Sequence, residues 1–199
     1  MSVFRAIPGE TPIDDISGLK VKGVTLRKEL NALEAENIRK PFVKYLAVKP
    51  SRRSAKFDLA WAMKLHREMF GDVWKWAGQL RKLNLNLGVD HSQVETSLHQ
   101  LFENLKYRDK LPGVSVFSEA VVLHHQAVHI HPFLNGNGRW ARLLSNIWLK
   151  LHDHCIVLWP EKSVGDTSPI RQAYLDAIKS ADRGDISALE KLHRRWLKK

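Results

Sequence analysis

Two neighbouring segments with different apolar patterns place the strongest constraint on the fold. From about Val116 to Ile130 the sequence is apolar nearly all round, which predicts a helix buried on every side. After Gly138 the apolar residues recur at intervals of three and four, as in a helix with one buried face; they are Trp140, Leu143, Leu144, Ile147, Trp148 and Leu151. The two segments predict an all-α domain organised around a central helix.

The stretch that joins these segments carries chemistry. His131 precedes a proline, which disfavours helical backbone and should end the central helix there. Gly136 and Gly138 allow a tight turn, and the helix that follows offers free N–H groups and a positive dipole end to an anion. Arg139 and Arg142 are neighbours on its polar side and suit phosphate oxygens. The stretch predicts a phosphate site with a histidine that can act as a general base for a hydroxyl nucleophile.

Capping residues and amphipathic patterns predict further helices. They cover 26–38 after a Thr25 cap, Ser54 to about Phe70, a helix opened by the capping box Ser92-Gln93-Val94-Glu95, 169–180, and 186–198 after an Asp185 cap. Pro41 is expected to break the first of these helices, because proline cannot donate the helical hydrogen bond.

A single segment has the alternation of a strand. Leucine or valine at 83, 85, 87 and 89 alternates with Asn84, Asn86 and Asp90, and Gly88 marks a turn. This pattern predicts a small β-hairpin. The expected fold class is therefore all-α with a small hairpin.

Chain length and cysteine content indicate the domain organisation and the cellular compartment. At 199 residues the chain is expected to form one compact unit, with an N-terminal arm and helix over 1–53, open to a regulatory role, and the main domain over 54–199. The single cysteine, Cys155, cannot form an internal disulfide and is expected in the core. The N-terminus has no apolar signal core, and no run approaches the roughly 18 apolar residues of a membrane span. A cytoplasmic location without a membrane partner is expected.

The net charge of +11 predicts affinity for acidic partners. A basic nucleic-acid-binding protein is one interpretation of this charge. Solvated helix faces, such as the basic C-terminus with Arg194 and Arg195, are the other. Because no recognised nucleic-acid-binding motif accompanies the charge, nucleic acid is kept only as an alternative partner.

The motif also carries a family resemblance. His131-Pro132-Phe133-x-x-Gly136-Asn137-Gly138-Arg139-x-x-Arg142 resembles the signature of the Fic (filamentation induced by cAMP)/Doc family. The stretch Phe70–Arg81 is similar to the aromatic turn before that family's flap hairpin, and Ala181–Asp185 to the stretch before its last helix. The region from Thr25 to Ile38 and the Asn-containing motif most resemble the branch called mobile mystery protein B. The resemblance implies an all-α Fic fold with a β-hairpin flap.

The resemblance also implies an activity: a protein nucleotidyltransferase that moves AMP, or another NMP, from a nucleoside triphosphate such as ATP to a hydroxyl side chain of a target protein. His131 would take the hydroxyl proton. The nucleotide-binding set implied is Gly136, Asn137 and Gly138 at the α-phosphate, Arg139 at the β/γ-phosphates and Arg142 at the γ-phosphate. The target protein would lie along the Leu83–Asp90 flap by strand addition. Phosphotransfer of the Doc type is less expected, because Doc-type motifs lose the second glycine and Gly138 is present.

One position departs from the family pattern. Asn135 stands where the family usually has Asp or Glu, the carboxylate that holds Mg²⁺. An amide oxygen can ligate Mg²⁺ or Mn²⁺ but brings no charge, so metal affinity should fall. This leaves a second hypothesis open, a nucleotide-binding regulatory module with weak or no catalysis.

Two further features concern regulation and metals. Family members often silence themselves with a Ser/Thr-x-x-x-Glu-Gly/Asn helix whose Glu pairs with the second motif arginine, and partial matches make Glu36 or Glu29 a candidate inhibitory residue. His125 and His129 lie four apart, which is acceptable for metal ligands. Because no Cys, Asp or Glu completes a pattern there, hydrogen-bonded structural histidines are the preferred interpretation.

Overall fold

The fold is built around two helices, as the sequence predicts. The computed structural model describes residues 16–24, 26–164 and 168–198. In it α4 (Val116–Ile130) packs along α5 (Asn137–Leu151), and both are largely buried. The Ser145 hydroxyl donates to the Ala120 carbonyl across this contact at 2.8 Å. Burying each Leu or Ile side chain of this pair contributes about 1.5–3 kcal/mol.

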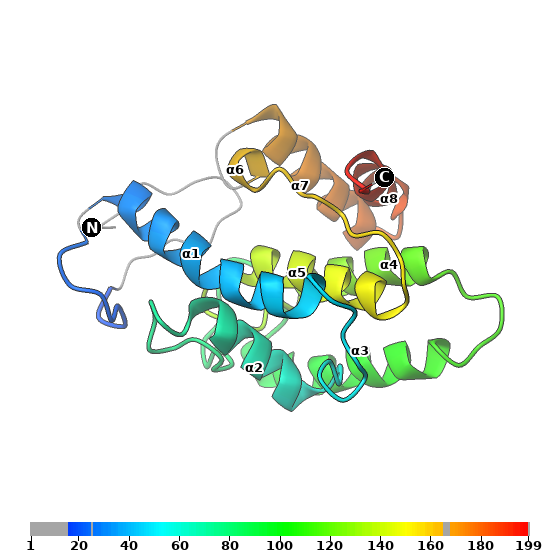
Figure 1. Cartoon of the computed structure of the whole chain (residues 1–199), viewed down its shortest axis with the longest axis horizontal. Helices are drawn as coiled ribbons and strands as arrows, with labels where there is room; N and C mark the ends of the chain where they lie inside the picture. Colours follow the sequence, from blue (N-terminus) through cyan, green and yellow to red (C-terminus); the bar gives the residue numbers. More distant parts are fainter. Residues whose placement is uncertain (1–15, 25, 165–167, 199) are drawn as a thin grey trace.

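The other helices cover this pair from two sides. Figure 1 shows α4 and α5 across the middle, with α2 (Leu59–Phe70) and α3 (Val94–Arg108) on one side and α6 (Glu161–Val164), α7 (Pro169–Asp182) and α8 (Ser187–Arg195) on the other. The first helix, α1 (Arg27–Leu46), lies against α2 and α5. The all-α prediction is confirmed, and the short α6 was not predicted.

The predicted break at Pro41 is wrong, because α1 continues through the proline to Leu46. Proline inside a helix costs about 3 kcal/mol. The residues beyond it offset this cost, since Tyr45 and Leu46 are buried against the rest of the core. The Asn37 amide fixes the helix further, bonding the Glu68 carbonyl at 3.1 Å and the Asp72 N–H at 2.9 Å. Thr25, the predicted cap, lies outside the described residues.

The start of α2 also differs from the prediction. Ser54 forms a turn with Ser51, and the helix begins only at Leu59, where the Asp58 carboxylate accepts from the Trp61 N–H at 2.7 Å. The reason lies at Phe57, whose backbone has φ +48° and cannot continue a right-handed helix. This backbone places the Phe57 ring in the core against Trp61.

The predicted β-hairpin is not seen. The described part of the chain contains two isolated bridges and no strand, and neither bridge involves 83–90. Leu83 and Leu87 of the alternating pattern are exposed. The segment is instead a loop whose ends are joined, because the Asn84 amide donates to Asp90 at 2.8 Å and its carbonyl accepts from the His91 N–H at 2.7 Å. We call residues 83–90 the flap loop.

Three smaller expectations also change. Asp90, rather than Ser92, caps the 3₁₀ turn η1 (His91–Gln93) that precedes α3. Cys155 is exposed and not in the core. The expected Asp185 cap also differs, because the N-cap of α8 is Ile186. Asp185 lies one residue earlier, and its carboxylate accepts from the Ser187 N–H at 3.0 Å.

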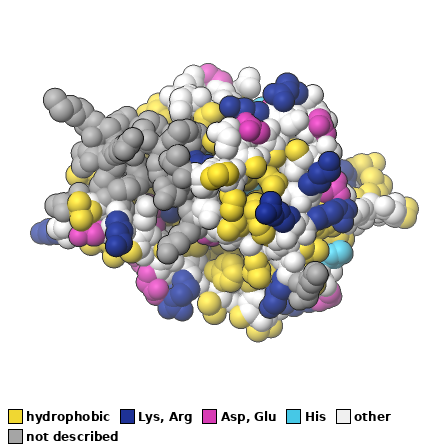
Figure 2. All heavy atoms as spheres, turned by 90° about the horizontal axis from the view of Figure 1, so that it is seen from above, with side chains coloured by type: hydrophobic (Ala, Val, Ile, Leu, Met, Phe, Trp, Pro, Cys, Tyr) yellow, Lys and Arg dark blue, Asp and Glu magenta, His cyan; other side chains and the backbone are white. Residues whose placement is uncertain are grey.

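Two observations concern the partners considered from the sequence, nucleic acid and membrane. Figure 2 shows the Lys and Arg side chains of one face standing apart, with Asp and Glu side chains among them. No helix among the described residues is both long and apolar enough to cross a membrane.

Candidate nucleotide site

The backbone at His131 ends α4, as predicted. This residue has φ +53° and ψ +59° and forms the C-cap of α4. Arg81 holds it there: its Nε donates to the His131 carbonyl at 2.7 Å and its backbone N–H to the Pro132 carbonyl at 3.0 Å. Arg81 is itself buried and also bonds the Leu83 carbonyl at 3.0 Å. One guanidinium therefore positions both the histidine and the flap loop.

The His131 ring is set up as a neutral imidazole. Its Nδ1 lies 3.3 Å from the Val128 carbonyl, a geometry in which Nδ1–H donates and Nε2 carries the lone pair. Burial lowers the pKa of His131 to about 4; the Val128 carbonyl works in the opposite direction and the Arg81 charge adds to the lowering. At neutral pH the ring can therefore accept a proton. Phosphate charge beside it would raise its pKa toward the range of an efficient base.

The flap loop lies directly on this histidine. Gly88 has φ +97°, and a Cβ there would come within 2.6 Å of the His131 Cβ and 3.0 Å of the Ile130 carbonyl. Only glycine allows both the conformation and the close approach. The loop predicted to present a target is thus in contact with the predicted base.

The motif turn is closed by its own side chains. Asn137 accepts from the Phe133 N–H at 2.9 Å and donates to the Phe133 carbonyl at 2.8 Å, so both polar groups of its side chain bond within the turn. Phe133 is fully buried. Gly136, with φ +78°, opens α5, and a Cβ there would lie 2.5 Å from the Phe70 ring. Asn137 thus shapes the turn through its side chain.

His66 of α2 packs against the motif turn, and its role there was not predicted from the sequence. Its Nδ1 accepts from the Gly78 N–H at 3.0 Å, so its Nε2–H donates to the Asn135 carbonyl at 3.1 Å. The ring stacks on Phe133 with centroids 3.7 Å apart. Complete burial lowers the pKa of His66 to about 3, which keeps it neutral. A histidine on the buried face of an amphipathic helix was the available signal.

Asn135 offers a poor metal ligand. It is buried, and its Oδ1 accepts from the Gly136 N–H at 2.6 Å. This bond also turns the Gly136 amide toward Asn135. The glutamates that contact the motif helix, Glu34 and Glu161, are each bonded to an arginine. Since Mg²⁺ prefers charged oxygen ligands, these residues do not provide a metal site of their own.

Arg139 is held by a glutamate of α1. Its Nη1 lies 2.7 Å from Glu34 Oε2, while Glu34 Oε1 accepts from the Trp74 indole N–H at 2.7 Å. The guanidinium also lies 4.8 Å from the centroid of the Phe70 ring. Glu34 is only 2% exposed, so this is a buried carboxylate with both oxygens bonded.

Arg142 is held by a second glutamate. Its Nε and Nη2 bond the two oxygens of Glu161 at 2.9 and 2.5 Å, and its guanidinium lies 5.7 Å from the centroid of the Tyr174 ring. Burial acts to lower the pKa of Arg142, but the Glu161 carboxylate and Tyr174 outweigh it and raise that pKa well above its usual value. Tyr174 in turn bonds the buried His124 at 3.0 Å.

The two glutamates proposed from sequence occupy other places. Glu36 pairs with Arg39 at the surface at 2.8 Å, and Glu29 accepts from the Leu26 N–H at the start of α1 at 3.1 Å. The residue of α1 that contacts the motif is Glu34. It shares a helix face with Leu30, Asn37 and Pro41, at spacings of three and four, and this periodicity was the signal that could have identified it.

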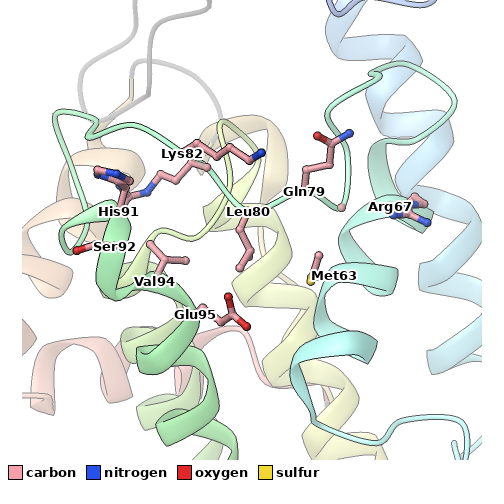
Figure 3. A pocket seen from close by; sticks show the side chains of 11 residues that line it. Met63, Arg67, Gln79, Leu80, Lys82, His91, Ser92, Val94 and Glu95 are labelled. Carbon is pink, nitrogen blue, oxygen red and sulfur yellow. The ribbon is translucent and has the colours of Figure 1, made fainter.

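A groove lies beside the flap loop. It has a volume of about 640 Å³ and runs between α2, residues 78–82 and the start of α3. Figure 3 shows Arg67 and Gln79 on one side of it and Lys82 and His91 on the other. The remaining labelled lining residues are Met63, Leu80, Ser92, Val94 and Glu95. The groove thus combines apolar walls with a mostly basic rim.

A central helix that ends in a histidine, followed by a glycine-opened helix with two arginines near its start, defines a helical domain of the Fic type. Residues 56–149 match the model of the Fic/DOC family. The Fic domain of Bep8 from Bartonella sp. 1-1C superposes with a TM-score of 0.70 at 17% identity, covering 97% of this chain and 94% of that one. BepC from Bartonella tribocorum, solved with bound AMPPNP, gives 0.66 at 19% identity, covering 92% and 94%.

Curated relatives agree with the structural neighbours. Protein adenylyltransferase VbhT of Bartonella schoenbuchensis is 32% identical over 45% of this chain and 20% of its own length. Protein adenylyltransferase Fic of Drosophila grimshawi is 30% identical over 62% of this chain and 25% of its own length. The chain thus spans about a fifth to a quarter of these relatives. Its residues 56–149 match the Fic/DOC family, and its fold is the all-α Fic fold.

Proposed function

We propose that the chain is a protein nucleotidyltransferase that transfers AMP from ATP to a hydroxyl side chain of a target protein. The observation that carries the proposal is the neutral His131 at the end of α4, directly before a glycine-opened helix that bears Arg139 and Arg142. The relatives named protein adenylyltransferases support AMP transfer, and the AMPPNP-bound structure of BepC supports nucleotide binding.

The reaction follows from these positions. His131 Nε2 takes the proton of the target hydroxyl as its oxygen attacks the α-phosphorus. A new P–O bond forms to the target, the bond to the β-phosphate oxygen breaks, and pyrophosphate leaves. Amides at the start of α5 stabilise the charge on the α-phosphate. Arg139 and Arg142 receive the β- and γ-phosphates after exchanging their glutamate partners for phosphate oxygens.

The target is proposed to lie along the flap loop. That loop contacts His131 through Gly88, so a side chain held beside it would be close to the base. The groove next to the loop, with Arg67 and Lys82 at its rim, extends this surface and favours a target with acidic residues near its hydroxyl. A target or lysate incubated with ATP should carry an adenylyl adduct on Ser, Thr or Tyr by mass spectrometry, and none with His131→Ala. His99→Ala, an exposed change on α3, is the matched control.

A second candidate is a nucleotide-binding regulatory module, and one observation favours it. Asn135 brings no charge to the metal position, and both motif arginines are bonded to glutamates. Nucleotide binding without any adduct in the wild-type chain, under conditions where Asn135→Asp does form one, would support the module over the enzyme. The nucleic-acid alternative has weaker support, because basic side chains on the viewed face are dispersed among acidic ones (Figure 2).

A further inference from the structure

A second cluster of chemically competent side chains lies where α4 meets the end of α7. His125 Nε2 lies 2.9 Å from Asp182 Oδ1, and His129 Nδ1 lies 3.0 Å from the same oxygen. The three ligand atoms all lie within 4.8 Å of one another. The prediction that no acidic residue completes the histidine pair is wrong, because folding brings Asp182 to it from the end of α7.

The geometry suits a single metal ion. The histidines are four apart on one helix, so both rings reach the same point above its surface. Zinc bonds imidazole nitrogen at about 2.0–2.1 Å and carboxylate oxygen at about 2.0–2.2 Å, which places tetrahedral ligand atoms about 3.3 Å apart. The contacts of the two histidine nitrogens with Asp182 Oδ1, at 2.9 and 3.0 Å, are within a few tenths of an ångström of that spacing. Small rotations of these side chains would admit the ion.

The donor set selects the class of metal. Two imidazoles and one carboxylate suit zinc and its transition-metal neighbours, whereas Mg²⁺ and Ca²⁺ prefer oxygen ligands alone. The side chains of His129 and Asp182 are 55% and 38% exposed, so an ion can reach them and water can fill the fourth position. This cluster shares no residue with the motif turn.

We propose that His125, His129 and Asp182 bind one divalent transition-metal ion, zinc foremost, which clamps α4 to α7. Such an ion would affect the relative positions of two motif residues. His129 is two residues before His131, and α7 carries Tyr174, which lies beside Arg142. An ion at this position would fix the base relative to the second arginine. The proposal stands on these contacts and does not depend on the proposed function.

The test is metal binding to the untagged, chelator-stripped protein. Zinc titration by calorimetry is expected to give one ion per chain. Cobalt(II) should produce the visible absorption of a tetrahedral site, lost on adding zinc and retained in excess Mg²⁺. His129→Ala and Asp182→Asn are each expected to weaken binding at least tenfold. The exposed-histidine change His99→Ala should leave it unchanged.

Two controls separate binding at this site from misfolding of a variant and from binding at the exposed cysteine. Zinc should raise the thermal midpoint of the wild-type protein and not that of Asp182→Asn, which retains the shape of the side chain and reports on the site if His129→Ala is poorly folded. Because Cys155 is exposed, Cys155→Ser is included. Binding that survives both His129→Ala and Asp182→Asn, or that disappears in Cys155→Ser, would overturn the proposal.

Discussion

Replacing Glu34 by glutamine removes one negative charge from the contact with Arg139 and keeps the shape of the side chain. The glutamine carbonyl can still accept from the Trp74 indole, which Glu34 contacts at 2.7 Å. What is lost is the charged pair between Glu34 Oε2 and Arg139 Nη1, also at 2.7 Å. Any phosphate that binds Arg139 must displace this carboxylate, so the substitution should favour nucleotide.

The magnitude follows from the burial of the two groups. Hydrogen bonds to charged groups contribute about 1.5–3 kcal/mol. The lower part of this range applies, because the Arg139 side chain is 27% exposed while that of Glu34 is 3% exposed. A change of about 1.5–2 kcal/mol corresponds to roughly a 10–30-fold lower Kd for ATP. Auto-modification should rise in parallel if access of the triphosphate limits the reaction.

Calorimetry with ATP measures this effect, and Glu36→Gln is the matched control. Glu36 lies on the same helix but pairs with Arg39 at the surface, so its substitution should leave ATP affinity unchanged. An ATP affinity in Glu34→Gln that equals or falls below that of wild type would refute the view that Glu34 competes with phosphate. An equal gain in ATP affinity in Glu36→Gln would show that the loss of any negative charge from α1 causes the effect.

Three further predictions concern the motif. Asn135→Asp keeps the acceptor for the Gly136 N–H and adds charge, so label transfer should increase and become steeper in Mg²⁺ concentration. Gly136→Ala forces a side chain at φ +78° to within 2.5 Å of the Phe70 ring, so urea unfolding should show a loss of about 2–4 kcal/mol. Burial lowers the pKa of His131 to about 4, so the unfolded state binds more protons between that value and about 6.5. Stability should therefore fall as pH drops through this window, by up to roughly 3 kcal/mol, and urea titrations should find a smaller fall in His131→Gln.

Local signals in the sequence predict the centre of the fold. The apolar pattern of α4 and the stripe of α5 fix these helices, and the proline after His131 and the glycine at 136 mark the turn between them. Each of these features depends on residues a few positions apart. Pattern and turn chemistry are enough to predict such elements.

The misassigned elements depend on contacts distant in sequence. Pro41 lies inside α1 because Tyr45 is buried in the core. Phe57 delays α2 because its ring packs on Trp61 and Trp148. The alternating flap segment has no partner strand among the described residues and becomes a loop. In each case tertiary packing outweighs local preference.

The same distinction holds at the candidate site. The motif residues come together because they are consecutive, but their partners come from distant segments. Glu34 is 105 residues from Arg139, and Asp182 is more than fifty residues from both metal-site histidines. Sequence spacing gives no information about such pairs. The structure thus adds the groups that restrain the arginines.

The central claim is transfer of the α-phosphate group with His131 as the base, and labelled ATP tests it most directly. The protein is incubated with its target, or with itself, and ATP labelled in either the α- or the γ-phosphate. Label should reach protein from the α-position alone, and His131→Ala should abolish it while leaving ATP binding within a few fold of wild type. Label from the γ-position, or α-label that persists in His131→Ala, would contradict the account.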